Sequence, residues 1–402
     1  MKEINVSDLR VGMYVAKLDR PWLDTPFLMQ GFLIESRDDI EVVAEYCEHV
    51  FIDAVREKWV PPEERFTSDF KQDRKVKYIH KVEAQDEHRK ALGVYRASKK
   101  ITKGLMEKAA LQGLVDTEEA KNTVDGCVQS VIRNPNALLW MSRVREMDEY
   151  TSEHSINVCI YAVSFGRFLG LEEKELQDLG LCALLHDVGK MRVPPEILNK
   201  SDKLSDKEFK MIKAHTVHGR NLLMSSPGML PAAIDVAYGH HERMDGDGYP
   251  RKIKGNGTST FSRIVAIVDA YDAMTAERCY APSIPSTDAL KNIFQDRATH
   301  FDDRLAKEFI KFVGLYPPGT LVELVNGMIG IVLASNPEQN RLPKIIVVLD
   351  RDKRMCKEKI YNLIQINEGH LEEEFLIKRS LVDGEYGVSI KAYQEKGLIF
   401  GR

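Results

Sequence analysis

Residues 181–190, LCALLHDVGK, carry an apolar run directly into His186 and Asp187, and Gly189 follows. The run is typical of a buried helix, and a glycine just beyond it favours termination. An aspartate in that setting costs free energy to bury unless it is paired or coordinated. The pair therefore indicates either two ligands turned toward one ion or a capping aspartate beside a solvent-facing histidine. Alone, it does not separate these two interpretations.

The chain around this stretch is rich in histidines that have carboxylates close by in the sequence. Six of the eleven histidines fall within 88 residues. Scattered histidines are usually polar residues of helix surfaces, but imidazoles clustered with carboxylates suit cations such as Fe, Mn, Co, Ni or Zn. The pattern therefore favours a metal centre. The histidines are His154, His186, His215, His218, His240 and His241, and the carboxylates are Asp187, Glu242, Asp245, Asp247 and Asp269.

Helical patterns surround the histidines from about residue 66 to residue 313. Residues 83–111 form a long, charged and periodic stretch, and residues 261–275 form an apolar one. The spacing of Ser205 and Glu208 is that of a capping box at the start of a helix. We therefore predict that residues 66–313 form an all-helical domain that holds the histidine cluster.

Strand patterns precede the helical region. Residues 13–16 and 49–52 are short apolar runs, and Pro61-Pro62 marks a linker. We therefore expect residues 1–65 to form a small α/β module.

Strand patterns also follow the helical region. Residues 321–325 and 328–333 flank Asn326-Gly327, the preferred dipeptide of a tight hairpin turn. We therefore expect residues 314–402 to form a small β-rich domain.

Composition limits the classes of function. The 402 residues carry a formal net charge of −4, so the chain lacks the basic excess of proteins that bind DNA or RNA polymers. None of the six cysteines forms a C-x-x-C motif, which favours reduced thiols in a reducing compartment. No apolar stretch is long enough for a membrane span, and the N-terminus lacks a signal-like core. A cytoplasmic location is therefore expected.

Two motifs carry a resemblance to a known family. His186-Asp187-x-Gly189-Lys190 and residues 240–250, HHERMDGDGYP, resemble the two signature motifs of HD-GYP phosphodiesterases. The similarity extends from about Tyr150 to Tyr280. The first 65 residues are also similar to an uncharacterised N-terminal domain that is often fused to this family. The resemblance implies a mainly α-helical HD-type metal phosphohydrolase core as the catalytic domain.

The resemblance implies a centre with two divalent metal ions, Fe or Mn in the first place, with Ni, Co or Zn as further candidates. Some family members hold a third ion through a Glu four residues before the first ligand, but here Tyr150 stands at that position. His218 is expected on a helix surface, and Asp272 is expected to support a ligand. The implied ligands of one ion are His154, His186, Asp187 and Asp269, and those of the other are His215, His240 and His241, with Asp187 bridging both.

The activity implied is hydrolysis of cyclic di-GMP to pGpG, with onward cleavage to GMP left open. Two ions close together can generate hydroxide near neutral pH and neutralise charge on phosphoryl oxygens. Asp187 and Lys190 are the expected catalytic residues, and Lys190 and Arg278 the expected phosphate-binding cations. Residues 248–250, namely Gly248, Tyr249 and Pro250, are expected to shape the guanine side of the cleft and to contact diguanylate cyclase (GGDEF) partners.

One departure from the family pattern concerns substrate choice. Many relatives read Arg-Pro-Tyr-Arg or Arg-Pro-Tyr-Lys where this chain reads Arg278-Cys279-Tyr280-Ala281. A second basic group that could touch the substrate is therefore absent at residue 281, and the preferred cyclic dinucleotide stays open.

Three alternatives accompany the favoured function. A cyclic GMP-AMP phosphodiesterase would use the same chemistry. A general HD phosphohydrolase acting on mononucleotides has no need of the complete run at residues 240–250, which argues against it. A non-catalytic dinucleotide-binding or scaffold protein has little need of all seven expected ligands.

Overall fold

The computed structural model of this chain describes residues 2–10, 13–20, 32–34, 40, 43–44, 46–52, 76–143, 150–198, 200, 202, 204–276, 284–336, 339 and 341–395. The chain divides into two compact units, residues 1–72 with 339–341 and residues 73–338 with 342–402. Each unit has its own apolar core. No helix among the described residues is both long and apolar enough to cross a membrane.

The N-terminal unit is built on a four-stranded antiparallel sheet in the order β1-β4-β2-β3. Val15, Ile34 and Val50 are fully buried in its core. The strand predicted at residues 49–52 is found at those residues, and the strand predicted at residues 13–16 is found one residue later. The Pro61-Pro62 linker lies outside the described residues. The strands are β1 (Lys2–Asn5), β2 (Tyr14–Leu18), β3 (Phe32–Leu33) and β4 (His49–Ile52).

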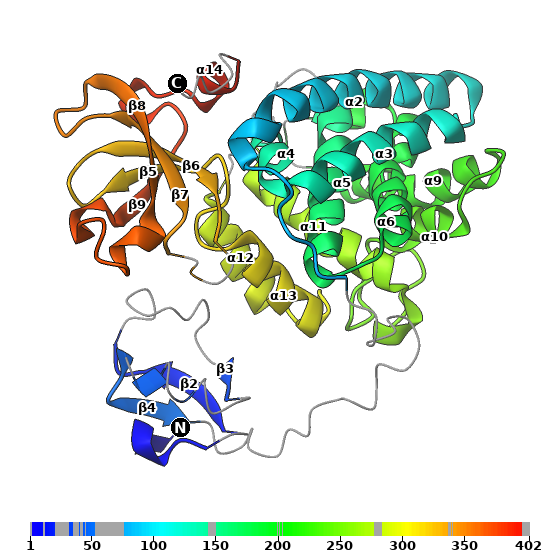
Figure 1. Cartoon of the computed structure of the whole chain (residues 1–402). Helices are drawn as coiled ribbons and strands as arrows, with labels where there is room; N and C mark the ends of the chain where they lie inside the picture. The colour runs from blue at the N-terminus through cyan, green and yellow to red at the C-terminus, as the bar shows by residue number, and fades with distance from the viewer. Residues whose placement is uncertain are drawn as a thin grey trace. The chain divides into compact units, whose positions relative to one another are not determined.

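The second unit begins with helices, as the periodicity predicts. Two of them, α5 and the second half of α6, are largely buried and lie inside the bundle, whereas α2 and α3 run side by side across them (Figure 1). The helices up to the His-Asp pair are α2 (Ala84–Gln112), α3 (Thr117–Arg133), α4 (Pro135–Met141), α5 (Tyr150–Leu169) and α6 (Glu173–Leu185).

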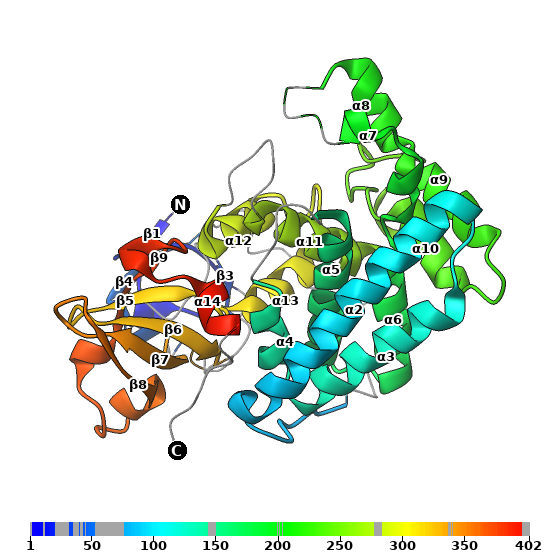
Figure 2. The ribbon, with the colours of Figure 1, turned by 90° about the horizontal axis from the view of Figure 1, so that it is seen from above.

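The remaining helices pack around α5 and α6, and α7 and α8 form an outlying arm next to α9 (Figure 2). The expected capping box of α8 is present, because the Ser205 side chain and the Glu208 side chain each accept a backbone N–H of the other residue. These elements are the 3-10 turn η4 (Val188–Arg192) and the helices α7 (Pro195–Leu198), α8 (Asp206–Lys213), α9 (His215–Met224), α10 (Pro231–Gly239), α11 (Thr260–Thr275), α12 (Ser286–Gln295) and α13 (Asp303–Val313).

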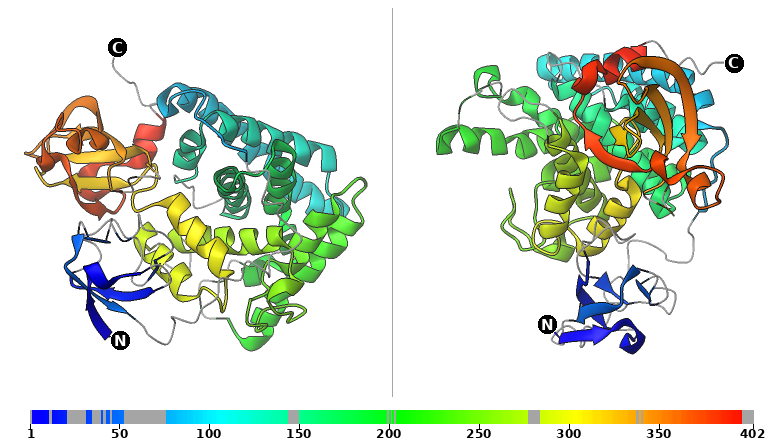
Figure 3. Two further views of the ribbon diagram at one scale, coloured as in Figure 1. Left: turned by 60° about the horizontal axis from the view of Figure 1, so that its bottom comes forward. Right: turned by 90° about the vertical axis from the view of Figure 1, so that its left-hand side faces the viewer.

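A five-stranded antiparallel sheet in the order β8-β7-β6-β5-β9 ends the second unit (Figure 3). The hairpin expected around Asn326-Gly327 joins β5 to β6, and Gly327 supplies the left-handed backbone of its turn (φ 84°). Strand β6 packs against α2 and α4. The boundaries at residues 65/66 and 313/314 stay predictions. The strands are β5 (Leu321–Leu324), β6 (Ile329–Ala334), β7 (Lys344–Leu349), β8 (Met355–Asn362) and β9 (Ile377–Leu381), and α14 (Ile390–Glu395) follows them.

Candidate metal centre and active site

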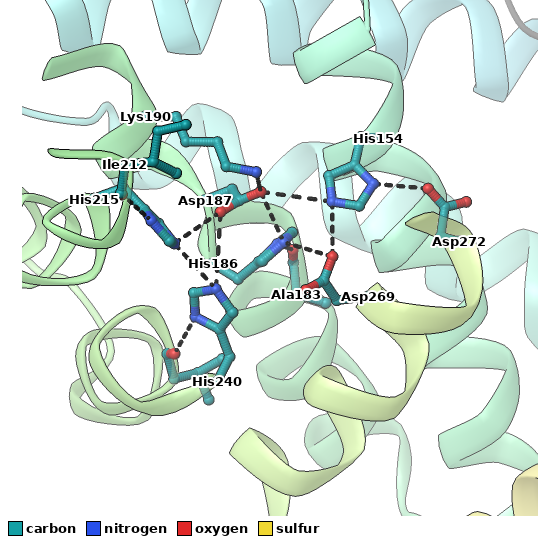
Figure 4. A network of polar contacts seen from close by, with 11 residues as sticks. His154, Ala183, His186, Asp187, Lys190, Ile212, His215, His240, Asp269 and Asp272 are labelled. Atoms are coloured by element: carbon teal, nitrogen blue, oxygen red, sulfur yellow. Dashed lines mark hydrogen bonds and ion pairs between the residues drawn. The ribbon is translucent and has the colours of Figure 1, made fainter. Parts of the chain in front are cut away.

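The fold brings the seven expected ligands together from distant parts of the chain, and Figure 4 labels all of them except His241. They come from α5, the end of α6, the start of α9, the end of α10 and the middle of α11. They form two groups, and within each group one ligand atom per residue lies within 4.8 Å of the others. One group consists of His154, His186 and Asp269, and the other of Asp187, His215, His240 and His241.

Asp187 stands between the two groups and offers one carboxylate oxygen to each. Its Oδ2 lies 3.5 Å from His154 Nε2 and 3.3 Å from His186 Nε2. Its Oδ1 lies 3.3 Å from His215 Nε2 and 3.8 Å from His240 Nε2. The side chain is only 1% exposed. A carboxylate in this position can bridge two cations.

The rings of three histidines are fixed by main-chain carbonyls behind them. Nδ1 of His186 donates to Ala183 O at 2.7 Å, and Nδ1 of His215 donates to Ile212 O at the same distance. Nδ1 of His240 donates to Val236 O at 2.9 Å. With the proton on Nδ1, each ring turns the lone pair of Nε2 into the centre, which is the arrangement of metal-binding histidines.

Asp272 fixes the fourth ring. Its Oδ2 accepts from His154 Nδ1 at 2.7 Å, while His154 Nε2 lies 3.0 Å from Asp269 Oδ1. Asp272 is fully buried and stands behind the ring rather than in either ligand group. This geometry agrees with the supporting role expected for Asp272.

The donor atoms fit divalent cations. Among the described residues, His186 Nε2 and Asp187 Oδ1 are buried without a hydrogen-bond partner, and buried polar atoms normally have one. Imidazole and carboxylate donors in such a mixture are typical of Fe, Mn, Co, Ni or Zn sites. The two groups of residues could therefore hold one cation each.

Burial and neighbouring charges set most of these groups in the form that binds metal. Burial lowers the pKa of His240 to about 3, and burial also lowers the pKa values of His215 and His241. Burial alone would raise the pKa of the Asp187 carboxyl, but the charges of Lys190 and His186 hold it well below its usual range. These imidazoles are therefore neutral and the carboxylate is ionised near pH 7, as coordination requires.

His154 differs from the other ligands. Burial alone lowers its pKa, but hydrogen bonds to Asp187, Asp269 and Asp272 raise it to about 10. A proton on this ring offsets the negative charge of the three carboxylates around it. A cation in this group would take over that electrostatic role.

Gly189 explains why the His-Asp pair can approach α9. A Cβ atom at this residue would lie 1.9 Å from His215 O and 2.3 Å from Gly219 N, so no other residue fits. The close approach of η4 to α9 brings Asp187 to His215. It also leaves Lys190 Nζ in contact with Asp187 Oδ2.

The turn-rich loop at residues 240–250 is held by Glu242. Its buried carboxylate accepts from the backbone N–H groups of Arg251 at 2.6 Å and Ile253 at 3.1 Å. A Cβ on Gly248 would lie 2.4 Å from Arg243 N, so the loop requires glycine there. These contacts fix the shape of the loop. The sequence did not predict this role of Glu242, because a carboxylate in a turn-rich segment gives no indication of which N–H groups will donate to it.

Tyr249 faces the centre. Its ring stacks on His241 with 4.7 Å between ring centroids and an angle of 27°. Burial raises the pKa of its phenol, helped by the charges of Asp187 and Asp269. The neutral ring therefore forms one wall beside a ligand. Pro250 follows through a cis peptide bond.

Some expected features lie outside the described residues. They are Arg278, the altered segment up to Ala281 and the side chain of Tyr150. His218 belongs to neither ligand group, in agreement with its expected place on a helix.

The arrangement suits phosphoryl chemistry. Cations held by these ligands would supply Lewis acidity and a water of lowered pKa. Asp187 fixes the spacing of the two groups, and Lys190 adds a positive charge beside them. Hydrolysis of a phosphate ester is a reaction that such a site can perform.

Comparisons with known proteins agree with this chemistry. Residues 138–305 match the HD domain family, and residues 1–120 match a domain of unknown function (DUF3391). The chain is 34% identical over 357 residues to cyclic di-GMP phosphodiesterase PA4108 from Pseudomonas aeruginosa, covering 86% of this chain and 85% of that protein.

Two further relatives match a smaller part of the chain or have a lower sequence identity to it. The chain is 34% identical over 169 residues to 3'3'-cGAMP-specific phosphodiesterase 3 from Vibrio cholerae, covering 42% of this chain and 36% of that protein. The solved structure of Bd1817, a HDG"Y"P protein from Bdellovibrio bacteriovorus, aligns at 16% identity with a TM-score of 0.47, over 77% of this chain and 97% of that one. On the near-full-length match to the Pseudomonas protein and on its own motifs, the chain is an enzyme of the HD-GYP cyclic dinucleotide phosphodiesterase family.

Proposed function

We propose that this chain hydrolyses cyclic di-GMP to pGpG, and onward to GMP, at a centre of two metal ions. The observation that carries the proposal is the placement of Asp187, whose two oxygens each face a separate group of imidazoles. The similarity to a cyclic di-GMP phosphodiesterase over most of both chains supports the substrate.

The proposed roles follow from position. Asp187 bridges the ions, and the two groups of histidines with Asp269 complete their coordination. Iron or manganese is the proposed native ion, with nickel, cobalt or zinc as substitutes that the same donors accept. Lys190 neutralises charge on the phosphoryl oxygens, and Arg278 does so from the segment after α11. Gly248, Tyr249 and Pro250 form the guanine side of the site.

Cyclic GMP-AMP is the second candidate substrate. Ala281, where many relatives carry a basic residue, leaves the preferred cyclic dinucleotide open. The cGAMP-specific relative from Vibrio cholerae shows that the family includes such a preference. Both substrates should therefore be compared side by side.

The proposal extends to location and partners. The enzyme acts in the cytoplasm, which is supported by the free thiols of all five cysteines that the structure describes. The loop at residues 240–250 would also bind diguanylate cyclase (GGDEF) proteins. Co-purification of such a cyclase with the parent chain, and its loss in a Tyr249→Ala variant that keeps its metal, would support this interaction.

The decisive experiment is an assay of freshly purified, manganese- or iron-loaded protein with cyclic di-GMP, resolved by chromatography. We expect pGpG from the parent chain with two metal ions per chain by elemental analysis. Asp187→Ala should lower turnover by about 10³-fold or more, because it removes the bridge between the ions. Full metal loading without product would refute the proposed activity, and product from Asp187→Ala would refute the site.

A further inference from the structure

Lys213, the last residue of α8, holds its ammonium against two aromatic rings. Its Nζ lies 4.4 Å from the ring centroid of Phe209 and 5.0 Å from that of Tyr249. The Lys213 side chain is partly buried, whereas Phe209 is 48% exposed. An aromatic face attracts a cation, so the two rings fix where this charge stands.

The charge of Lys213 is not matched by a carboxylate. Throughout the described part of the chain, no carboxylate oxygen lies within 4.0 Å of its Nζ. Lys190 and Lys200, by contrast, contact Asp187 and Glu208. Two rings offset only part of the cost of removing an ammonium from water. A partly buried cation of this kind gains most when an anionic ligand binds beside it.

The position of Lys213 relates it to the metal centre. It precedes the ligand His215 by two residues, and the ring it contacts stacks on the ligand His241 with 4.7 Å between centroids. The ring of Tyr249 therefore lies between the ammonium of Lys213 and the ligand His241. This places the charge beside the centre, where a second phosphate of the same substrate could reach it.

We propose that Lys213 binds the phosphodiester of the cyclic dinucleotide that is not being cleaved. This role makes Lys213 a substrate-binding residue for molecules with two phosphates. The inference rests on the proposed function, because only a substrate with a second phosphodiester has a group for Lys213 to hold.

The test compares substrates with one and two phosphates. Lys213→Met keeps most of the apolar stem but removes the charge, and Lys210→Met is the matched control on the exposed side of the same helix. Cyclic di-GMP and 3′3′-cyclic GMP-AMP carry two phosphodiesters, whereas bis(p-nitrophenyl) phosphate carries one. KM and kcat are measured for all three, with metal content determined for each variant.

We expect Lys213→Met to raise KM for the cyclic dinucleotides about 10- to 100-fold, the usual effect of a lost charge-assisted hydrogen bond. KM for bis(p-nitrophenyl) phosphate and the metal content should stay at the parent level, as should all values for Lys210→Met. Lys213→Arg should restore most of the affinity, because it restores the charge.

The outcomes separate the two proposals. An unchanged KM for the cyclic dinucleotides, or an equal rise for bis(p-nitrophenyl) phosphate, would overturn the role of Lys213 while the proposed function stands. A parent chain that cleaves bis(p-nitrophenyl) phosphate but neither cyclic dinucleotide would overturn the proposed function, and the role of Lys213 with it.

Discussion

Single residues behind the ligands decide how well the centre is organised. Asp272 accepts from Nδ1 of His154, on the side of the ring away from the ligand groups, and so fixes the direction of Nε2. Partners of this kind typically change metal affinity or activity 10- to 100-fold.

We predict that Asp272→Asn weakens metal binding or lowers kcat by about 10- to 100-fold without unfolding the chain. The amide removes the negative charge that favours a proton on Nδ1. Competition with a chelator measures the affinity, and Asp288→Asn, at an exposed surface pair with Lys291, is the control. Equal metal affinity in both variants would contradict the role of Asp272.

His88 makes stability depend on pH. It is 5% exposed and packs edge-on against Trp140. Burial lowers its pKa from 6.5 to about 4, so the unfolded chain takes up this proton at a higher pH than the folded chain does. The contribution of His88 to the free energy of unfolding is therefore complete above pH 6.5, and it is lost as the pH falls toward 4.

We predict that His88→Gln shows a weaker loss of unfolding free energy between pH 7 and pH 5, by about 2 kcal/mol. Denaturant unfolding of the metal-loaded parent and variant at both pH values measures the difference. Buried ligands such as His240 act in the same direction, so both proteins must carry equal metal. Parallel pH dependences would show that another group is responsible.

At this scale, the sequence pointed to the histidines and carboxylates that the structure brings together, but not to the groups that orient their rings. His186, Asp187 and His240 can be recognised as candidate ligands because a cluster of imidazoles and carboxylates is rarely explained by a purely structural role. The groups that aim the rings are main-chain carbonyls of Ala183 and Val236. Every residue has a carbonyl, so no side-chain pattern could have singled them out.

Between elements, α2 is tied to the helix that carries His154. Lys99 of α2 pairs with Glu153 of α5, whose side chain is 3% exposed. One turn away, Tyr95 donates from its hydroxyl to Asn157 Oδ1 at 3.1 Å. Two polar contacts on either side of His154 fix how the helices align along their length.

We predict that Glu153→Gln or Lys99→Met destabilises the fold by about 3 kcal/mol, because each leaves a charge buried without its partner. The double variant should lose less than the sum of the two. Lys108→Met, which breaks an exposed pair between α2 and Glu119 of α3, should change stability little. Additive losses in denaturant unfolding would show that the pair is not coupled.

Element boundaries illustrate what local patterns can and cannot reveal. The predicted helix at residues 83–111 appears at 84–112, because charge and periodicity persist along it. Helix α3 ends before Asn134-Pro135, and α4 begins at Pro135. Proline is well suited to the first helical position, so the same residue served both purposes.

For the molecule as a whole, ions bound at the candidate metal centre would link the helices to the stability of the second unit. Its ligands come from five helices or helix ends, and the unfolded chain has no such arrangement. Ions that bind only the folded state stabilise it through mass action.

We predict that removal of metal by a chelator lowers the melting temperature by about 5–10 °C, and that added manganese restores it. Calorimetry of the parent chain, with and without chelator, checks this expectation. Asp187→Ala should melt at nearly the same temperature in both conditions. A parent chain whose melting ignores the chelator would indicate that ions contribute little to its fold.

The order of strand-rich, helical and strand-rich segments could be predicted, because hydrophobic period and turn signals are local. The packing of β6 against α2 and α4 could not, since contacts between distant elements leave no mark on spacing. Glu323 shows the same limit: it lies inside the buried strand β5, and Lys353 and Arg379 from elsewhere in the sheet neutralise it.

The pairing of His154 with Asp269 has a topological consequence. The two residues lie 115 positions apart, as their numbers show, yet their side chains meet at 3.0 Å. A cation bound by both residues would close a loop of the chain as a disulfide does. A covalent loop of roughly that size stabilises the folded state by about 4–5 kcal/mol, because it lowers the entropy of the unfolded chain. Unlike a disulfide, this cross-link is lost when the ion dissociates. A protease that unfolds the chain from one end would therefore meet a cross-linked loop when metal is plentiful and an open loop when metal is scarce.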